Sequence, residues 1–276
     1  MTIVVALAAA GVAWWEIQSP HAGRNGLRTI TFMTHSRLLH RDLSQEAVVP
    51  ERGGAGRPLL VMLHGRGGSP KGEMSNQLFA VLQSLGRRAP DVVAVDGGDA
   101  SYYHDRQDGP WGSYVVKEAI PQAIALLHAD PHRVAIAGTS MGAFGELDIA
   151  RLWPRRFCAV GGNSPAIFLF GAQSAAGAFD DAEDFPRHDL LAVARADPRI
   201  YGRIPLWIDT GTEDFFRQAD TEFAHLLRGG GEQVTFHVWP GGHAEQHWDG
   251  HFPLYIQFFA RALAGCGNDG VGFPAS

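Results

Sequence analysis

The chain has 276 residues, with 23 Lys and Arg against 29 Asp and Glu, which gives a formal net charge of −6. Hydrophobic residues make up 45% of it and charged residues 19%, a balance that predicts a globular protein with a large core and excludes a disordered chain. Because Lys and Arg form no run, we expect no nucleic-acid partner. The length fits a single large α/β domain.

The N-terminal residues 1–25 carry an uncharged apolar run of 13 residues, Ile3–Trp15, that ends before Glu16. This run is shorter than the roughly 20 residues that span a bilayer. It fits the apolar region of a signal peptide with small residues at 11–13 for cleavage, although the basic segment that normally precedes it is missing. A buried helix is the alternative. We therefore expect residues 1–25 to be a signal-like or membrane-anchoring segment and the protein to be secreted or associated with a cell envelope.

Residues 26–264 alternate β-rich runs with helix-like segments. Strands are predicted at Leu27–Phe32, Ser44–Val49, Leu59–Leu63, Val92–Val95, Val134–Gly138, Phe157–Gly161, Leu206–Asp209 and Val234–Val238. Helices are predicted at Met74–Leu85, Ser113–His128, Met141–Trp153, Asp189–Ala196 and Pro253–Leu263. The first two strands read as antiparallel edge strands, and Pro121 predicts a kink in its helix. This alternation is typical of an α/β fold with a mostly parallel sheet and helices on both faces.

The most informative stretch is Arg133–Gly145, an apolar strand that leads through G-x-S-x-G directly into a helix. In a nucleophile elbow the Ser occupies a strained turn at the end of a strand, which exposes its Oγ. Gly138 and Gly142 would remove the Cβ atoms that collide as strand and helix approach. Although an ordinary Gly-rich turn is the alternative, the flanking strand and helix favour Ser140 as a nucleophile.

Ligands in open α/β sheets bind beyond the carboxyl ends of the strands, and a Ser, an acidic residue and a His follow three of the predicted strands in the order of α/β-hydrolases. His243 lies in a Gly-rich loop after the last strand, and we predict that it is the general base for Ser140. The alternatives for the base are His247 and His251, while His237 lies inside a strand pattern and reads as structural.

The acidic member is predicted to be Asp214, in the loop that follows the strand at 206–209. It would fix the tautomer of His243 and stabilise the imidazolium ion. Glu213 and Asp209 are the alternatives. Acidic residues that cap the helix near Asp220 are the structural alternative for this loop.

Two backbone amides are predicted to form an oxyanion hole. The first is the N–H of Met141, directly after the nucleophile, and the second is the N–H of Arg66 in the Gly-rich loop His64–Gly68. The guanidinium of Arg66 would meet either a polar substrate group or solvent.

No cofactor or metal is expected at the predicted site. His243 and His247 are four residues apart, but the sequence between them departs from the zinc-binding H-E-x-x-H pattern. The acidic run 180–184 reads as a solvated turn, with a cation site as the alternative. Two cysteines form no disulfide framework, and Cys158 reads as a small buried apolar residue.

Residues 164–203 separate two strands by more than an ordinary loop and are predicted to form a lid or cap. Its apolar residues would form either an acyl-binding wall or core packing: Ile167, Phe168, Leu169, Phe170 and Phe179. The tail at 265–276 is expected to be disordered.

These motifs together resemble the putative esterase family of α/β-hydrolases, which includes esterase D, feruloyl esterases and mycolyltransferases of the antigen 85 type. The resemblance rests on the following segments: Leu63–Gly68, Asp96–Tyr103 with Trp111, Gly138–Gly142 and Gly242–Trp248. It implies an α/β-hydrolase fold and a triad of Ser140, Asp214 and His243. Mycolyltransferases characteristically have Glu as the triad acid and begin the oxyanion loop with Asp-Gly. Asp214 and the His64-Gly65 pair differ from that pattern and favour hydrolysis.

The sequence therefore predicts a serine carboxyl-ester hydrolase that forms an acyl-enzyme on a small-molecule, lipid or sugar ester. The first alternative is a mycolyltransferase-like acyltransferase that uses a sugar hydroxyl instead of water. A peptidase finds less support, and a non-catalytic envelope-binding protein on the same fold is the alternative outside the enzymes.

Overall fold

A computed structural model gives the structure of the protein and describes residues 26–202, 204–267 and 272–274. The predicted signal-like segment 1–25 lies outside the described residues. Within the described part of the chain, every helix is too short or too polar to span a bilayer.

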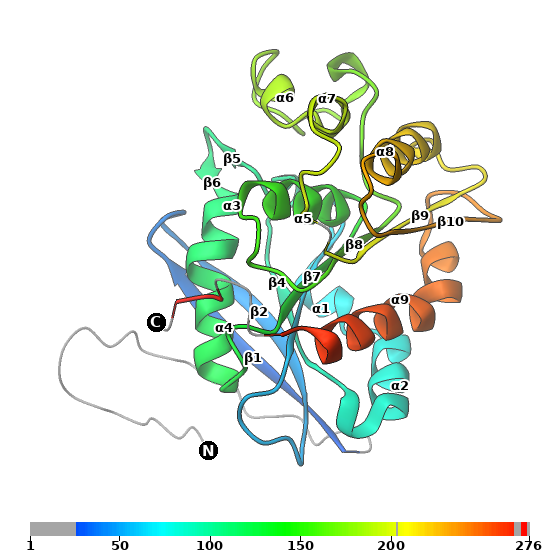
Figure 1. The fold of residues 1–276 in the computed structure, drawn as a ribbon. Coiled ribbons are helices and arrows are strands. Elements are labelled where there is room, and N and C mark those ends of the chain that lie inside the picture. The colour runs from blue at the N-terminus through cyan, green and yellow to red at the C-terminus, as the bar shows by residue number, and fades with distance from the viewer. Residues whose placement is uncertain (1–25, 203, 268–271, 275–276) are drawn as a thin grey trace.

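The core of the fold is an eight-stranded sheet with the strand order β1-β2-β4-β3-β7-β8-β9-β10 (Figure 1). Its strands are β1 (Leu27–Ser36), β2 (Arg41–Pro50), β3 (Leu59–Leu63), β4 (Asp91–Val95), β7 (Val134–Thr139), β8 (Val160–Asn163), β9 (Leu206–Gly211) and β10 (Val234–Trp239). β2 is antiparallel to its neighbours β1 and β4. The six strands that follow β2 in this sheet order, β4, β3, β7, β8, β9 and β10, are parallel to one another. A short hairpin, β5 (Asp105–Arg106) and β6 (Gly109–Pro110), lies outside this sheet. The predicted α/β-hydrolase fold is therefore confirmed.

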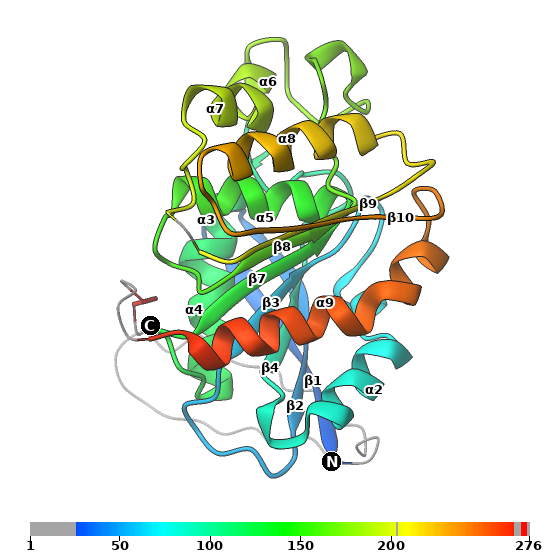
Figure 2. The same cartoon turned by 45° about the vertical axis from the view of Figure 1, so that its right-hand side comes forward.

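Helices cover both faces of the sheet and divide the core into two layers (Figure 2). One face carries α2 (Asn76–Leu85) and α9 (Glu245–Gly265), which pack on each other and on the strands. The other face carries α3 (Trp111–Tyr114), α4 (Ile120–Leu127), α5 (Met141–Leu152) and α8 (Arg217–Gly229). α1 (Pro70–Glu73) is a single turn before α2. Strands β3, β4 and β7 are buried on both faces, which explains their continuous apolar runs.

Several helix and strand boundaries differ from the sequence prediction, and three of them bear on the fold. α3 and α4 are joined by a π-helical turn, Val115–Ala119, directly before Pro121; a Pro lacks the amide hydrogen and its ring blocks a regular helical bond. β8 begins at Val160 rather than 157, and its pairing with both β7 and β9 begins at that residue. α9 begins at Glu245, eight residues before the predicted start, and contains Pro253.

The structure corrects the prediction for the two cysteines. Cys158, before β8, and Cys266, after α9, form a disulfide with a Cα–Cα distance of 5.7 Å. They are 108 positions apart in the sequence, and only the packing of α9 across the sheet brings them together. The predicted disordered tail therefore begins with a cross-linked residue, and farther along it Phe273 is buried against Phe157.

We expect loss of this disulfide to lower stability substantially. A cross-link over a loop of this length restricts the unfolded chain, and such bonds contribute about 2–4 kcal/mol. The Cys158→Ala/Cys266→Ala variant should therefore melt about 4–16 °C below the wild type in a calorimetric scan. Dithiothreitol should lower the melting temperature of the wild type by the same amount and leave the double variant unchanged. An equal response of both proteins to dithiothreitol would contradict this account.

The insertion 164–203 between β8 and β9 contains a 3-10 turn, α6 (Asp184–Arg187) and α7 (Leu190–Ala196), and it lies above α5 (Figure 1). Of its predicted apolar wall, Ile167 and Phe168 are buried in the core, whereas 52% of Phe170 is exposed. The Asp189 side chain caps α7 by accepting from the Ala192 amide.

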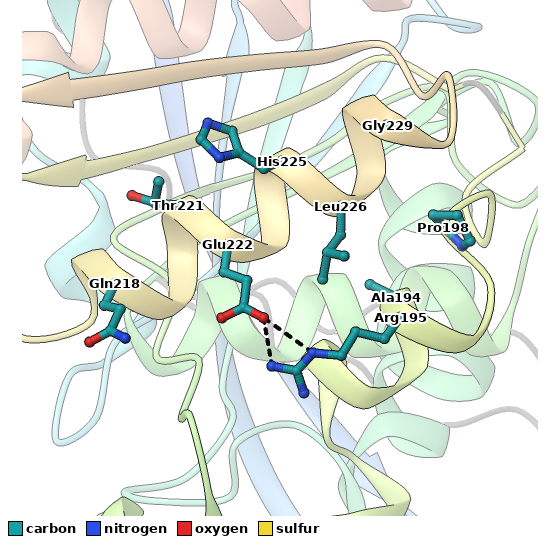
Figure 3. A pocket seen from close by; sticks show the side chains of 9 residues that line it. All are labelled: Ala194, Arg195, Pro198, Gln218, Thr221, Glu222, His225, Leu226 and Gly229. Atoms are coloured by element: carbon teal, nitrogen blue, oxygen red, sulfur yellow. Dashed lines mark hydrogen bonds and ion pairs between the residues drawn. The ribbon is translucent and has the colours of Figure 1, made fainter.

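A pocket of about 600 Å³ lies between α7 and α8 (Figure 3). Arg195 on α7 and Glu222 on α8 form an ion pair of 2.6 Å beside it. None of its nine lining residues is Ser140, Asp214 or His243; they are Ala194, Arg195, Pro198, Gln218, Thr221, Glu222, His225, Leu226 and Gly229. The ion pair links the insertion to α8, but both side chains are exposed, so it contributes little energy.

Candidate active site

Ser140 lies in a strained turn between β7 and α5. Its backbone has φ 53° and ψ −110°, a conformation that costs a non-Gly residue of the order of 1–3 kcal/mol. A Cβ atom at Gly138 would be 2.3 Å from the Gly142 carbonyl carbon, and one at Gly142 would be 2.0 Å from the Leu63 carbonyl oxygen. These positions therefore accept only Gly, and the strand-turn-helix geometry of the predicted elbow is present.

His243 is within hydrogen-bond distance of Ser140. Its Nε2 is 2.8 Å from Ser140 Oγ, and its Nδ1 is 2.9 Å from Asp214 Oδ2. The loop between β10 and α9 carries this imidazole over the carboxyl end of the sheet. The rings of Phe215, Phe216 and Trp248 surround it at centroid distances of 4.8, 5.2 and 5.1 Å. These contacts limit the positions that the ring can take.

Asp214 lies in the loop after β9 and its side chain is fully buried. Its Oδ1 accepts a hydrogen bond of 2.9 Å from the Phe216 amide. Burial by itself would raise the pKa of Asp214, but hydrogen bonds from His243, the Phe216 amide and Ser164 outweigh it and hold the pKa below its ordinary value. Asp214 is therefore ionised at neutral pH and accepts the Nδ1–H of His243, which leaves the Nε2 lone pair for the Ser140 hydroxyl.

The structure does not bring the alternative residues together with Ser140. Glu213 is exposed to solvent, and Asp209 accepts a hydrogen bond of 2.7 Å from Trp207 Nε1. His251 stacks on Trp239 at a centroid distance of 4.0 Å, and His237 stacks on the same side chain at 4.6 Å. The side chain of His247 lies outside the described residues.

Asp209 gives a prediction about stability and pH. Burial raises its pKa from 3.8 to about 7, against the hydrogen bond from Trp207. Between these two values the folded state binds more protons than the unfolded state, so the free energy of unfolding falls as the pH rises through this window. Asp209→Asn keeps an acceptor for Trp207 and removes the titration. We expect the loss of stability from pH 5 to pH 8 in urea unfolding to be about 2–3 kcal/mol smaller in this variant. An unchanged loss would show that other groups cause it.

The loop after β3 lies beside the nucleophile. A Cβ atom at Gly65 would be 3.7 Å from Ser140 Cβ, so the backbone of this loop approaches Ser140 closely. His64 holds the loop, because its Nδ1 contacts the Gly65 carbonyl at 2.9 Å and its Nε2 accepts from the Gly97 amide at 3.1 Å. The Arg66 side chain is exposed, as the solvated alternative predicted, and its guanidinium donates to the Ala176 carbonyl of the insertion.

Two residues that the sequence analysis did not assign to the site also support it. Ser164 follows β8, and its hydroxyl accepts a hydrogen bond of 3.0 Å from Trp248 Nε1 and hydrogen-bonds to Asp214. Trp248 on α9 also contacts the His243 ring. Ser164 could have been assigned to the site from the sequence, because it directly follows a strand. Trp248 lies within α9, so its position in the sequence gave no such indication.

A family model described as putative esterase matches residues 36–258 of the chain. The chain belongs to the putative esterase family. No curated protein matches the sequence of the chain. As a member of this family the chain is an esterase, a hydrolase of carboxylic esters, which confirms the resemblance drawn from the sequence.

Several solved structures share the fold of this esterase. A ferulic acid esterase has 21% identity and a TM-score of 0.73, over 86% of this chain and 98% of that one. An S-formylglutathione hydrolase from Agrobacterium tumefaciens has 19% identity and a TM-score of 0.74, over 90% and 99%. MPT51 from Mycobacterium tuberculosis has 19% identity and a TM-score of 0.63, over 84% and 97%. At these identities the likeness concerns the fold.

Proposed function

We propose that this esterase hydrolyses its substrate through an acyl-enzyme formed on Ser140. The observation that carries the proposal is the continuous hydrogen-bond chain from Ser140 Oγ through His243 to Asp214. A Ser hydroxyl is a weak nucleophile until an adjacent base removes its proton. The three side chains come from three different loops at the carboxyl end of one sheet, and no purely structural requirement demands that they meet there.

The two half-reactions use the same groups in turn. Ser140 Oγ forms a bond to the ester carbonyl carbon while its proton passes to His243 Nε2. The C–O bond to the alcohol then breaks, and the alcohol leaves with the proton from His243. A water molecule next gives its proton to His243 and attacks the acyl carbon, and the proton returns to Ser140 as the acid leaves. Asp214 stabilises the imidazolium ion in both halves.

The oxyanion of each tetrahedral intermediate is assigned to the amides of Met141 and Arg66. Met141 is the first residue of α5, where a helix leaves its amides without an intrahelical partner. In the β3 loop, the Gly67 and Gly68 amides donate to the Asp99 and Gly65 carbonyls. We therefore assign the second donor to Arg66, whose amide precedes them. Each such donor contributes roughly 10²–10³-fold to the rate.

The substrate is proposed to carry an apolar group next to its ester bond. Phe215 is 74% exposed although it packs on the His243 ring at 4.8 Å. An exposed aromatic ring beside a nucleophile provides apolar surface that a substrate covers. A small-molecule or lipid ester offers such a group.

Export or attachment to a cell envelope is a further part of the proposal. The disulfide between Cys158 and Cys266 supports it, because such bonds persist mainly outside the reducing cytosol.

Labelling by a fluorophosphonate tests the acyl-enzyme mechanism. This reagent reacts with an activated Ser, so the wild type should take up one label per chain, located at Ser140 by peptide mass spectrometry, and Ser140→Ala should take up none. A panel of p-nitrophenyl esters from acetate to palmitate then measures the preferred acyl length. Stoichiometric labelling of Ser140→Ala would overturn the proposal.

A further inference from the structure

A second cluster of histidine and acidic side chains lies apart from Ser140 and connects the insertion with the body of the protein. Within the described part of the chain, His104, Asp184 and His188 form the group whose chemistry and spacing suit a metal ion. Each offers one ligand atom, and these atoms all lie within 4.8 Å of one another. All three residues are buried. His104 comes from the body, just before β5, whereas Asp184 and His188 lie at the two ends of α6 in the insertion.

Two distances within the cluster, each to a different oxygen of Asp184, are close to those around a tetrahedral metal ion. His104 Nε2 is 3.1 Å from Asp184 Oδ2, and His188 Nε2 is 3.7 Å from Asp184 Oδ1. Zinc bonds of about 2.0–2.1 Å at tetrahedral angles place neighbouring ligand atoms roughly 3.3 Å apart. The Asp184 carboxylate therefore faces each imidazole at about the spacing of two ligands that share one ion.

The partners of His188 favour an ion between these groups. Its Nδ1 is 2.8 Å from Asp148 Oδ2 on α5. The Nε2 atom of His188 faces Asp184 Oδ1 at 3.7 Å, which is longer than a hydrogen bond, and a metal ion between the two atoms would be bound by both. A carboxylate that orients a ligating imidazole through its second nitrogen is a recurrent feature of metal sites. Asp148 in turn pairs with Arg151.

The charges around the cluster leave a route for an ion to enter. The Arg187 guanidinium contacts Asp184 Oδ1 at 3.1 Å, but its side chain is 61% exposed. It therefore competes with an ion for this oxygen and can swing into solvent when an ion binds. His104, on the inner side, stacks on Phe179 of the insertion at a centroid distance of 5.2 Å.

We propose that His104, Asp184 and His188 bind one divalent transition-metal ion of the zinc type, which fastens the insertion to the body. Two imidazoles and a carboxylate suit zinc and its neighbours rather than calcium or magnesium, which prefer oxygen ligands. A water molecule completes the four ligands of a zinc site with three protein side chains. None of these three residues takes part in the proposed ester hydrolysis, so the test of the metal site does not depend on the role of Ser140.

The first test measures zinc binding by the full chain without an affinity tag. After dialysis against a chelator, calorimetric titration with Zn²⁺ should show one site per chain. At a free concentration 100 times Kd, the melting temperature should rise by about 5–10 °C. His104→Gln and His188→Gln should each abolish the site. His225→Gln, an exposed histidine on α8, and His243→Ala should leave the zinc affinity unchanged. Absence of stoichiometric binding in the wild type, or its loss in His243→Ala alone, would overturn the proposal.

Two further variants test the site without removing a ligand. Asp148→Asn should weaken zinc binding about 10–100-fold, because Asp148 orients His188. Arg187→Ala, an exposed change that should not affect folding, should tighten zinc binding several-fold because it removes a competing cation. An affinity unchanged by Arg187→Ala would place the ion elsewhere on the chain. These two variants decide the question even where the His104→Gln and His188→Gln proteins fail to fold.

Discussion

We expect His243→Ala to lower kcat for a p-nitrophenyl ester by about 10⁶-fold, with KM within a few-fold of the wild type. In the proposed mechanism the imidazole removes the Ser140 proton, returns it to the leaving group and then activates the water, so its loss affects every chemical step. Substrate binding depends on other surfaces, which is why KM should change little. Steady-state kinetics with freshly purified protein, together with a circular dichroism spectrum to establish the fold, measure this effect.

Non-additivity distinguishes a triad from three independent contributions. Because Ser140 and His243 act as a unit in the proposed mechanism, Ser140→Ala should lower kcat about as much as His243→Ala, and the double variant should lose no more. His251→Gln is the matched control: His251 stacks on Trp239, and its replacement should change kcat by less than about threefold. Effects that multiply in the double variant would contradict a shared mechanism.

The nucleophile elbow could be predicted from the sequence because its causes are local. The Ser140 turn brings β7 and α5 so close that a Cβ at Gly138 or Gly142 would overlap backbone atoms, and such a requirement leaves a fixed pattern of residues. The strands β3, β4 and β7 could also be predicted from the sequence, because strands buried on both faces are recognisable as short apolar runs. Ser140, Asp214 and His243 could then be selected because each lies in the loop after a predicted strand.

The features that could not be predicted depend on contacts between distant parts of the chain. The cysteines pair only because α9 crosses the sheet and ends beside the start of β8. The early start of α9 places Trp248 against His243 and Ser164, and neither contact leaves a periodic pattern in the sequence. The acidic run 180–184 reads as a turn until the fold brings His104 next to Asp184.

The second large effect is expected from Asp214→Asn, which should lower kcat by about 10⁴-fold. Asp214 Oδ2 accepts from His243 Nδ1, and its Oδ1 accepts from the Phe216 amide. When an amide replaces the carboxylate, its Oδ1 is drawn to the Phe216 amide and its NH₂ group faces Nδ1. The imidazole then takes the opposite tautomer, with the hydrogen on Nε2, and no longer accepts the Ser140 proton.

The neighbouring Glu213 provides the control for this argument. It lies in the same loop but is exposed to solvent, so Glu213→Gln removes one negative charge near the site without affecting the His243 tautomer. Exposed charges contribute little energy, and kcat should change by less than about threefold. If Glu213→Gln were as damaging as Asp214→Asn, the loop would act through its overall charge. A large effect of Asp214→Asn alone would instead show that the contact between Asp214 and His243 Nδ1 is needed. Both substitutions replace a carboxylate by an amide in the same loop, but only the Asp214 carboxylate contacts the imidazole.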